Sequence, residues 1–254
     1  MADREAVTLA VSDHVAWITL ADVQRRNSLN PVLVDQLASA CAQVARDADA
    51  RVVVLRAEGP VFSAGGDLDS LGDRDIRWIY RGFEALESLA IPVIAAVHAP
   101  VIGAGVNFVL ACDVVVAGRS AAFDPLFLDV GIHPGGGHLW RMRQRVGEQG
   151  TAAMVLCGDA LTAEEAQERG LIWRCVEDAE LLEVVGRLAA KVVTRPPDLV
   201  RRTKATLRIM RALTDPKNAA EIEQIAQDWS MRQPAFTEAL ARIRERVRGR
   251  SEAS

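Results

Sequence analysis

The chain has 254 residues, of which half are hydrophobic and a quarter are charged, and its formal net charge is −4. This composition is typical of a folded globular protein and excludes an intrinsically disordered chain, and the small acidic excess gives no reason to expect a nucleic acid partner. A chain of this length buries most of the surface that its unfolded form exposes, so it can form one large domain or two smaller ones.

Cysteine usage and the N-terminal residues indicate the compartment. The four cysteines form no CxxC pair and stand among apolar neighbours, as free thiols in a reducing compartment do. The first residues, MADREAV, are charged and lack the apolar core of a secretory signal. The uncharged stretch 91–112 contains Pro92, Pro100 and two glycines, which favours a buried strand, turn and helix over a membrane span. We therefore expect a cytoplasmic protein without membrane contact.

The chain opens with the pattern of a hairpin followed by a helix. Two runs rich in apolar and β-branched residues, 6–11 and 15–20, are separated by a short polar turn and predict two paired strands. Asn30 followed by Pro31 predicts a helix start, because asparagine caps helices and proline suits their first position. Apolar residues then recur on one helical face.

Three further runs predict buried strands, and helical segments separate them. The runs are short and rich in valine, isoleucine and alanine, at residues 51–57, 91–98 and 113–117. Strands that alternate with helices form crossover units, so the predicted fold class is α/β with a mainly parallel sheet.

Helices dominate the chain after about residue 140. The segments with helical periodicity are 151–156, 162–169, 179–193, 199–213 and 219–231. Thr162 and Glu165 have the spacing of a capping box. Because the proline pair at 196–197 breaks any continuing helix, we expect an α/β core over residues 1–195 and a helical C-terminal region over residues 196–254.

Two of the predicted strands run directly into a glycine-containing turn. The segments are VVVLRAEGPVFSAGGDL (52–68) and PVIAAVHAPVIGAGVNFVL (92–110). Such turns leave backbone N–H groups unpaired, and those donors favour negative charge. Two turns of this kind that faced each other would form an oxyanion hole. Alternatively, the glycines only permit tight turns and close helix packing.

Four segments together resemble the enoyl-CoA hydratase (crotonase) superfamily. They are FSAGGDL, IGAGVNFVLACDVVVAGRSAAF, GIHPGGGHLWRMRQRVG and MVLCGDALTAEEAQERGLIWRCV, and the resemblance extends in order from about residue 7 to the C-terminal helices. It implies a crotonase-like spiral of ββα units with a C-terminal helical trimerisation region. It also implies an acyl-CoA thioester as substrate, no cofactor beyond the coenzyme A of that substrate, and a homotrimer or a dimer of trimers.

The resemblance also implies roles for individual residues. The two N–H groups of the family's oxyanion hole correspond to Gly66 and Ala104, and they would stabilise the enolate of the thioester. Ala64 corresponds to a position that lines the pocket of the CoA adenine. Arg25 or Arg26 resembles the family's basic contact to the CoA phosphates, although an ordinary solvated arginine would look the same.

The residues that carry proton transfer in the family's hydratases are replaced here. Those enzymes use two glutamates, and the corresponding positions are Asn107 and Phe127. Asparagine can orient water or a carbonyl but exchanges no proton near neutral pH, and phenylalanine can only pack. The aspartate of the related dienoyl-CoA isomerases corresponds to Gly135. The two-glutamate mechanism is therefore not expected in this chain.

The segment FLDVGIHPGGGH offers other candidates for proton transfer. His133 falls near the expected thioester pocket, and His138 follows it in the same glycine-rich segment; histidine is a natural acid or base. Alternatively, either imidazole only bonds the glycine-rich backbone. Asp129 is expected to be structural or to contact substrate.

Further residues are candidates for the edges of the site. Asp67, which closes the first glycine turn, is expected to cap backbone N–H groups beside the substrate. Aromatic side chains could form walls of an acyl pocket, although helical spacing is also typical of core positions: Trp78, Phe83, Phe127 and Trp140. No cluster with the spacing of metal ligands is present in the sequence.

The function expected from these residues is an acyl-CoA enzyme of the enoyl-CoA hydratase/isomerase type. An isomerase, lyase or hydrolase is favoured over a hydratase, because one proton carrier can serve those reactions. The alternative is a non-catalytic acyl-CoA carrier or sensor, which needs the pocket but no acid. The arginines of the tail ARIRERVRGR (241–250) are distributed around a helix, which favours a solvated or subunit-edge helix over an RNA site.

Overall fold

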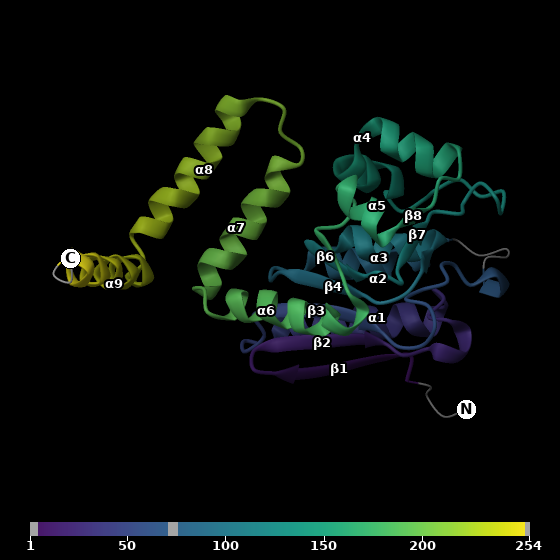
Figure 1. The fold of residues 1–254 in the computed structure, drawn as a ribbon, viewed down its shortest axis with the longest axis horizontal. Helices are drawn as coiled ribbons and strands as arrows, with labels where there is room; N and C mark the ends of the chain where they lie inside the picture. The colour runs from purple at the N-terminus through teal and green to yellow at the C-terminus, as the bar shows by residue number, and fades with distance from the viewer. Residues whose placement is uncertain (1–4, 71–75, 252–254) are drawn as a thin grey trace. The chain divides into compact units, whose positions relative to one another are not determined.

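A computed structural model describes residues 5–70 and 76–251, and its architecture is the predicted α/β class (Figure 1). Its strands are β1 (Val7–Ser12), β2 (Val15–Leu20), β3 (Val52–Ala57), β4 (Val93–Val97), β5 (Val101–Ile102), β6 (Val114–Gly118), β7 (Ala122–Asp124), β8 (Leu161–Thr162) and β9 (Arg174–Val176). Its helices are α1 (Pro31–Arg46), α2 (Arg77–Ser88), α3 (Val106–Ala111), α4 (His138–Leu156), α5 (Ala163–Glu168), α6 (Leu181–Val193), α7 (Pro197–Met210), α8 (Pro216–Met231) and α9 (Pro234–Ser251).

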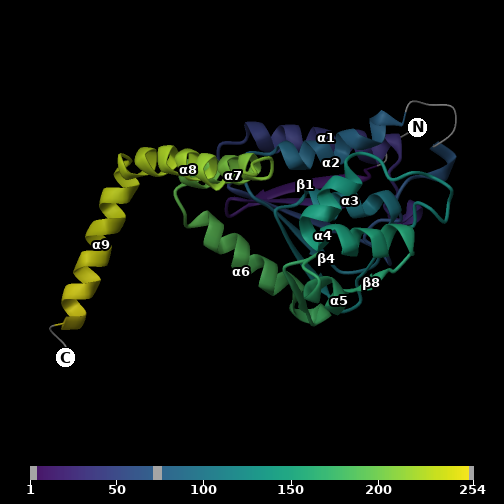
Figure 2. The same cartoon turned by 90° about the horizontal axis from the view of Figure 1, so that it is seen from above.

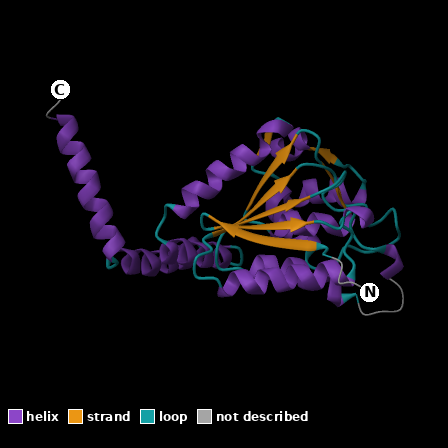
Figure 3. Ribbon diagram, turned by 90° about the horizontal axis from the view of Figure 1, so that it is seen from below, coloured by secondary structure: helices purple, strands orange, loops and turns teal. Residues whose placement is uncertain are grey.

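The main sheet has six strands in the order β1-β2-β3-β4-β6-β9. The hairpin β1–β2 is its antiparallel edge, and all other pairs are parallel, as the strand–helix alternation predicted. Figure 3 shows these strands side by side in one twisted sheet. A second, short sheet joins β5, β7 and β8.

The two faces of the main sheet are covered by different helices, and the period of two along each strand decides which side chain meets which layer. In β3, Val53 and Leu55 belong to the core shared with α1, α2 and α3. Val52 and Val54 of the same strand belong to a second core shared with α6. Figure 2 shows α1 and α2 on one side of the strands and α6 on the other. Strands covered on both faces explain the continuous apolar runs in the sequence.

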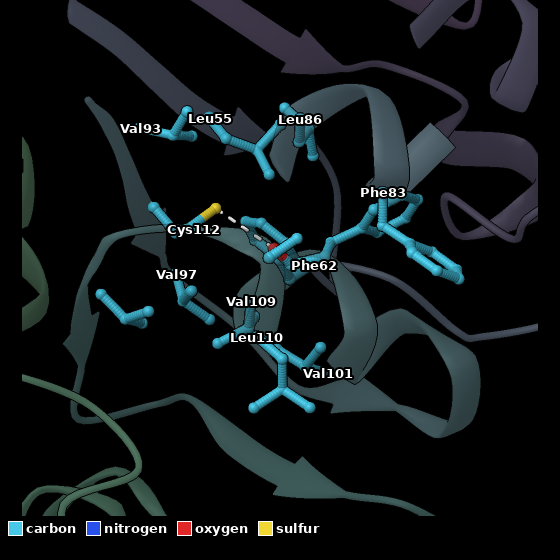
Figure 4. Close-up of a cluster of buried hydrophobic side chains, with 14 of the residues drawn as sticks. Leu55, Phe62, Phe83, Leu86, Val93, Val97, Val101, Val109, Leu110 and Cys112 are labelled. Atoms are coloured by element: carbon cyan, nitrogen blue, oxygen red, sulfur yellow. Dashed lines mark hydrogen bonds between the residues drawn. The ribbon is translucent and has the colours of Figure 1, made fainter. Parts of the chain in front are cut away.

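The larger core lies beneath the two glycine turns. Figure 4 shows Leu55 and Val97 of the sheet packed with Phe83 of α2 and with Val109 of α3. All six residues of α3 are buried, so this helix cannot turn a polar side chain to bulk solvent. A polar residue on α3 must therefore meet another protein group or a cavity.

Two helix starts lie where local signals predicted them. Asn30 caps α1 by accepting a hydrogen bond from the N–H of Leu33, at 3.1 Å, as predicted. The capping box of α5 is also confirmed, because Thr162 and Glu165 bond each other's backbone reciprocally.

The prediction for the segment before residue 151 was wrong. A helix was expected to start at residue 151, but α4 starts at His138 and contains a break at Gly147, where φ is +73°. The residue before the first residue of α4 is Gly137, which has φ +78° and no side chain to cap the helix. The sequence signal was weak because this helix starts without a capping residue and is interrupted by glycine.

The chain divides into two compact units, with the boundary between Val193 and Thr194. The second unit contains α7, α8 and α9, and within it the Arg202 guanidinium lies 4.3 Å from the centroid of the Trp229 ring. The arginine-bearing tail is helical within α9, although its side chains from residue 246 onward lie outside the described residues.

Candidate active site

The two glycine turns lie directly against each other. The N–H of Ile102 donates to the carbonyl of Ser63 at 2.9 Å. Gly65 has φ +87°, and a methyl group added to it would lie 2.7 Å from the carbonyl oxygen of Ile102. A methyl group on Gly105 would lie 2.7 Å from the Ser63 hydroxyl oxygen. Glycine is therefore required at both positions for this close approach.

The first turn is also held from its other side, by the segment before α1. The N–H of Ala64 donates to the carbonyl of Arg26, at 2.9 Å, and the N–H of Asp67 donates to the carbonyl of Leu29, at 3.3 Å. The N–H of Gly65 donates to the Ser63 hydroxyl, at 3.3 Å. Each neighbouring amide of Gly66 in this turn is thus paired, whereas the N–H of Gly66 makes no hydrogen bond within the described residues.

The backbone amide of Ala104, in the second turn, also lacks a hydrogen-bond acceptor among the described residues. Its N–H makes no hydrogen bond to any group in residues 5–70 and 76–251. Gly66 and Ala104 both line one cavity, which encloses about 780 Å³ of empty space, part of it open to solvent. Two amides without protein acceptors at one cavity can bind an oxygen that carries negative charge.

The wall of this cavity is contributed by several elements. Most of its side chains are apolar, as is usual in small-molecule sites. The predicted site residues that line it are Ala64, Gly66, Ala104, Asn107, Phe127 and His133. No carboxylate is among its lining residues in the described part of the chain.

Asn107 and His138 form a buried pair. Nδ1 of His138 lies 3.1 Å from Oδ1 of Asn107, and His138 is only 1 % exposed. Burial, aided by the positive charge of Arg141, lowers the pKa of His138 to about 4. The imidazole is therefore neutral at pH 7, and Nδ1 carries the proton that the amide oxygen accepts. The Nδ2 group of Asn107 makes no hydrogen bond within residues 5–70 and 76–251 and is not among their buried atoms without a partner, so it keeps accessible surface, and Asn107 lines the cavity.

His138 itself is not among the residues that line the cavity. Its ring packs edge-on against Phe127, with 4.8 Å between ring centroids. Its Nε2 is buried and has no hydrogen-bond partner among the described residues. The alternative role foreseen for it, a bond to the glycine-rich backbone, is not what the ring does, because its partner is a side chain 31 residues away.

Arg141 fixes the glycine-rich segment that precedes α4. Its guanidinium donates to the carbonyl of Gly136 and to the Glu87 carboxylate, with Nη2–Oε2 at 2.6 Å, and it lies 5.4 Å from the centroid of Phe83. Gly136 has φ +66°, a conformation that other residues adopt at a cost. The bond to its carbonyl holds this segment beside the cavity.

His133 lies at the edge of the cavity and is exposed. Its Nδ1 is 2.8 Å from the carbonyl oxygen of Pro134, and a carbonyl can only accept, so Nδ1 carries the proton. In the neutral ring Nε2 then carries the lone pair, and it makes no hydrogen bond within residues 5–70 and 76–251. Of the two histidines of this segment, His133 is thus the one that lines the cavity.

Several predicted residues lie outside the cavity wall. Arg25 and Arg26 are exposed, and only the backbone of Arg26 touches the first turn. The Asp67 carboxylate accepts a hydrogen bond from the Ser70 hydroxyl at 2.6 Å. Asp129 is exposed and does not line the cavity.

The four aromatic candidates separate into three groups. Phe127 lines the cavity, Trp140 is 46 % exposed, and the other two belong to the core, where Phe83 is fully buried and Trp78 packs half-buried against it. Tyr80 of α2 also lines the cavity and was not predicted. Its spacing from Ile76 places both on one helical face, but no sequence signal shows that this face meets a cavity rather than the core.

Neither a metal cluster nor a membrane-spanning helix is found in the described part of the chain. Within residues 5–70 and 76–251, no three His, Cys, Asp or Glu side chains gather closely enough to hold a metal ion. In the same residues, no helix combines the length and the apolar character needed to cross a bilayer.

Comparison with known proteins shows close similarity over almost the whole chain. Residues 10–247 match the family model described as enoyl-CoA hydratase/isomerase. The chain is 35 % identical over 258 residues to the Mycobacterium tuberculosis protein named "Probable enoyl-CoA hydratase EchA14", in a match that covers 97 % of this chain and 100 % of that protein. It is 33 % identical over 199 residues to the 2,3-dehydroadipyl-CoA hydratase of Escherichia coli, in a match that covers 76 % of this chain and 78 % of that protein.

The fold is shared with solved structures of the same kind. The crystal structure of an enoyl-CoA hydratase subunit from Geobacillus kaustophilus superposes with a TM-score of 0.89 at 25 % identity, covering 95 % of each chain. The crotonase-like architecture expected from the sequence motifs is therefore confirmed.

Proposed function

The chain belongs to the enoyl-CoA hydratase/isomerase family, and on that premise we propose that it stabilises the enolate of an acyl-CoA thioester with the backbone amides of Gly66 and Ala104. The observation that carries this proposal is that two amides at one cavity have no acceptor among residues 5–70 and 76–251. Donors that need no reorganisation stabilise a developing oxyanion strongly, and the loss of one such donor lowers a rate by about 10²–10³-fold.

His133 is the proton carrier in this proposal. Nε2 takes a proton from the carbon beside the thioester carbonyl, and the electron pair of that C–H bond moves onto the carbonyl oxygen as the enolate forms. The same nitrogen returns the proton when the enolate collapses, either to the same carbon or to another one. His133 is supported by its place at the cavity and by the bond that leaves Nε2 free.

Asn107 and His138 have a different part. His138 was expected to be a candidate acid or base, but a neutral ring that does not line the cavity suits a positioning role. By holding Oδ1 of Asn107, it directs the Nδ2 donor toward substrate or water. Phe127 then provides an apolar wall in place of a second acid.

One proton carrier favours an isomerase, lyase or hydrolase over the two-glutamate hydratase reaction. Coenzyme A is part of the substrate, and no other cofactor is proposed. Ala64 lines the cavity and would lie beside the adenine, and Arg25 or Arg26 would meet the CoA phosphates. We further propose a homotrimer or dimer of trimers in the cytoplasm, formed through the helical C-terminal region.

A non-catalytic acyl-CoA carrier or sensor is the second candidate. The observation that favours it is the absence of any carboxylate from the cavity wall among the described residues. A carrier would bind the thioester without breaking a C–H bond, and this difference can be measured directly.

Exchange of the α-protons tests the proposal whatever the overall reaction is. Phenylacetyl-CoA is incubated with the protein in D₂O, and mass spectrometry follows deuterium at the α-carbon. We expect exchange with the wild type and its loss in His133→Asn. The matched control is His14→Asn, because His14 is a half-buried histidine outside the cavity whose Nδ1 also bonds a backbone carbonyl, that of Asp49 at 3.0 Å.

The outcomes separate the two candidates. Tight binding without exchange in the wild type would favour the carrier. Exchange that persists in His133→Asn would remove His133 from the mechanism while leaving the enolate proposal in place. A second pair of ligands, phenylacetyl-CoA and the thioether that lacks its carbonyl oxygen, tests the amides: equal affinity for both would contradict the oxyanion hole.

A further inference from the structure

Tyr80 brings a hydroxyl group to the cavity that the proposed mechanism does not use. It is the only tyrosine of the chain, it lies on α2, and it lines the cavity. Its ring packs against Phe83, with 5.7 Å between centroids. Phe83 is fully buried, so the phenol of Tyr80 is supported by the core rather than free to swing.

The hydroxyl lies against the backbone of the glycine-rich segment. A methyl group added to Gly135 would overlap the Tyr80 hydroxyl oxygen. Gly135 also lines the cavity. The Tyr80 hydroxyl therefore occupies space that a side chain at position 135 would fill.

The hydroxyl has no hydrogen-bond partner in the described part of the protein. No hydrogen bond of the Tyr80 side chain to residues 5–70 or 76–251 is found. The buried side-chain atoms without a partner in this part of the chain are Asn27 Oδ1 and His138 Nε2, and the Tyr80 oxygen is not among them. It therefore keeps accessible surface, and water satisfies it when the cavity is open.

The surroundings of the hydroxyl decide what happens when a ligand displaces that water. The lining of the cavity is largely apolar, with Ile79, Ile132 and Phe127 in it, and Asn107 and His133 are its other polar side chains. A hydrocarbon acyl chain would leave the hydroxyl buried and unpaired, which weakens binding by about 5- to 150-fold. An acyl chain with an oxygen at that place would avoid this loss. No lysine or arginine lines the described cavity, so a neutral oxygen fits better than a carboxylate.

We propose that Tyr80 is a specificity-determining residue that selects acyl-CoA thioesters whose acyl group carries a hydroxyl or keto oxygen. This inference rests on the proposed function, because it assumes that the acyl group occupies this cavity. It adds a substrate class, oxygen-bearing acyl groups, that the oxyanion hole alone does not specify.

The test compares matched thioesters by calorimetry. Hexanoyl-CoA is measured against its 3-hydroxy, 4-hydroxy and 5-hydroxy derivatives. With the wild type, at least one hydroxylated thioester should bind about 5- to 150-fold more tightly than hexanoyl-CoA. In Tyr80→Phe the ratio should fall toward one, and hexanoyl-CoA should bind as tightly as before or more tightly, because no hydroxyl is left to desolvate. Structural damage would instead lower the affinity for all four thioesters.

A second variant and a spectroscopic signal check the same geometry. Gly135→Ala should displace the phenol and reduce the ratio as Tyr80→Phe does, and it should have a smaller effect in the Tyr80→Phe background. Because the chain has one tyrosine, labelling with [¹³Cζ]tyrosine gives a single resonance that reports on Tyr80. The preferred hydroxylated thioester should shift it more than hexanoyl-CoA does.

The failures are distinguishable. If none of the four thioesters binds the wild type, the proposed function itself is wrong. If all four bind with equal affinity, or if Tyr80→Phe leaves the preference unchanged, the selection by Tyr80 is refuted while acyl-CoA binding stands.

Discussion

The buried His138 predicts a specific loss of stability in acid. The folded chain holds the pKa of this imidazole at about 4, below the ordinary value of 6.5, because burial disfavours the charged ring. The unfolded chain therefore binds the proton more readily than the folded chain. The stability associated with a neutral His138 is fully present above about pH 6.5 and is lost as the pH falls toward 4.

The size of the effect follows from the shift. At about 1.4 kcal/mol for each pH unit, His138 should remove about 2.5 kcal/mol of unfolding free energy between pH 7 and pH 4.5. Most of the loss falls between about pH 6 and pH 4.5, a window that separates it in part from the carboxylates, which titrate lower.

Urea unfolding of the wild type and of His138→Gln at pH 7 and pH 4.5, at equal protein concentration, measures this contribution. Glutamine keeps an amide donor for Asn107 but has no titrating ring. The contributions of groups that titrate in both proteins cancel in the comparison. On acidification the unfolding free energy of the variant should therefore fall by about 2.5 kcal/mol less than that of the wild type. Equal losses in the two proteins would refute the buried neutral imidazole, and a directly measured His138 pKa near the ordinary value would do the same.

Two further predictions concern the frame of the site, and a third concerns the reactivity of two cysteines. Gly65→Ala should destabilise the protein by at least about 1–3 kcal/mol, because φ is +87° and the added methyl meets a backbone carbonyl; an unchanged Tm would contradict this. Arg141→Met should cost about 1–3 kcal/mol of stability, because it removes the charge-assisted bonds of the guanidinium to the Glu87 carboxylate and to the carbonyl of Gly136; unchanged stability in chemical denaturation would contradict this. At pH 8, iodoacetamide should modify the exposed Cys157 and spare Cys41, whose pKa is raised to about 12 by burial, as peptide mass spectrometry would show; labelling of Cys41 in folded protein would oppose this view.

The sequence alone determined the parts of the structure that depend on short-range signals. The hairpin, the start of α1 at Pro31 and the capping box at Thr162 each follow from residues within a few positions of one another, and the parallel pairing follows from the alternation of strand and helix patterns. The four segments that together carry the family resemblance were enough for the fold and the family. The assignment of the proposed oxyanion hole to Gly66 and Ala104 came from the family resemblance, whereas the glycine turns by themselves predicted only that some backbone amides would be left unpaired.

The tertiary structure decided how the polar side chains are used. The partnership of His138 with Asn107, the contact of Tyr80 with the backbone at Gly135 and the bond from Arg141 that holds the glycine-rich segment all join separate elements. No periodic pattern records such contacts, because periodicity shows which face of an element is apolar but not what that face meets. Two histidines in one glycine-rich motif were equivalent candidates in the sequence. Only packing made one a buried neutral ring and left the other at the edge of the cavity with a free nitrogen, because desolvation depends on the whole surrounding fold.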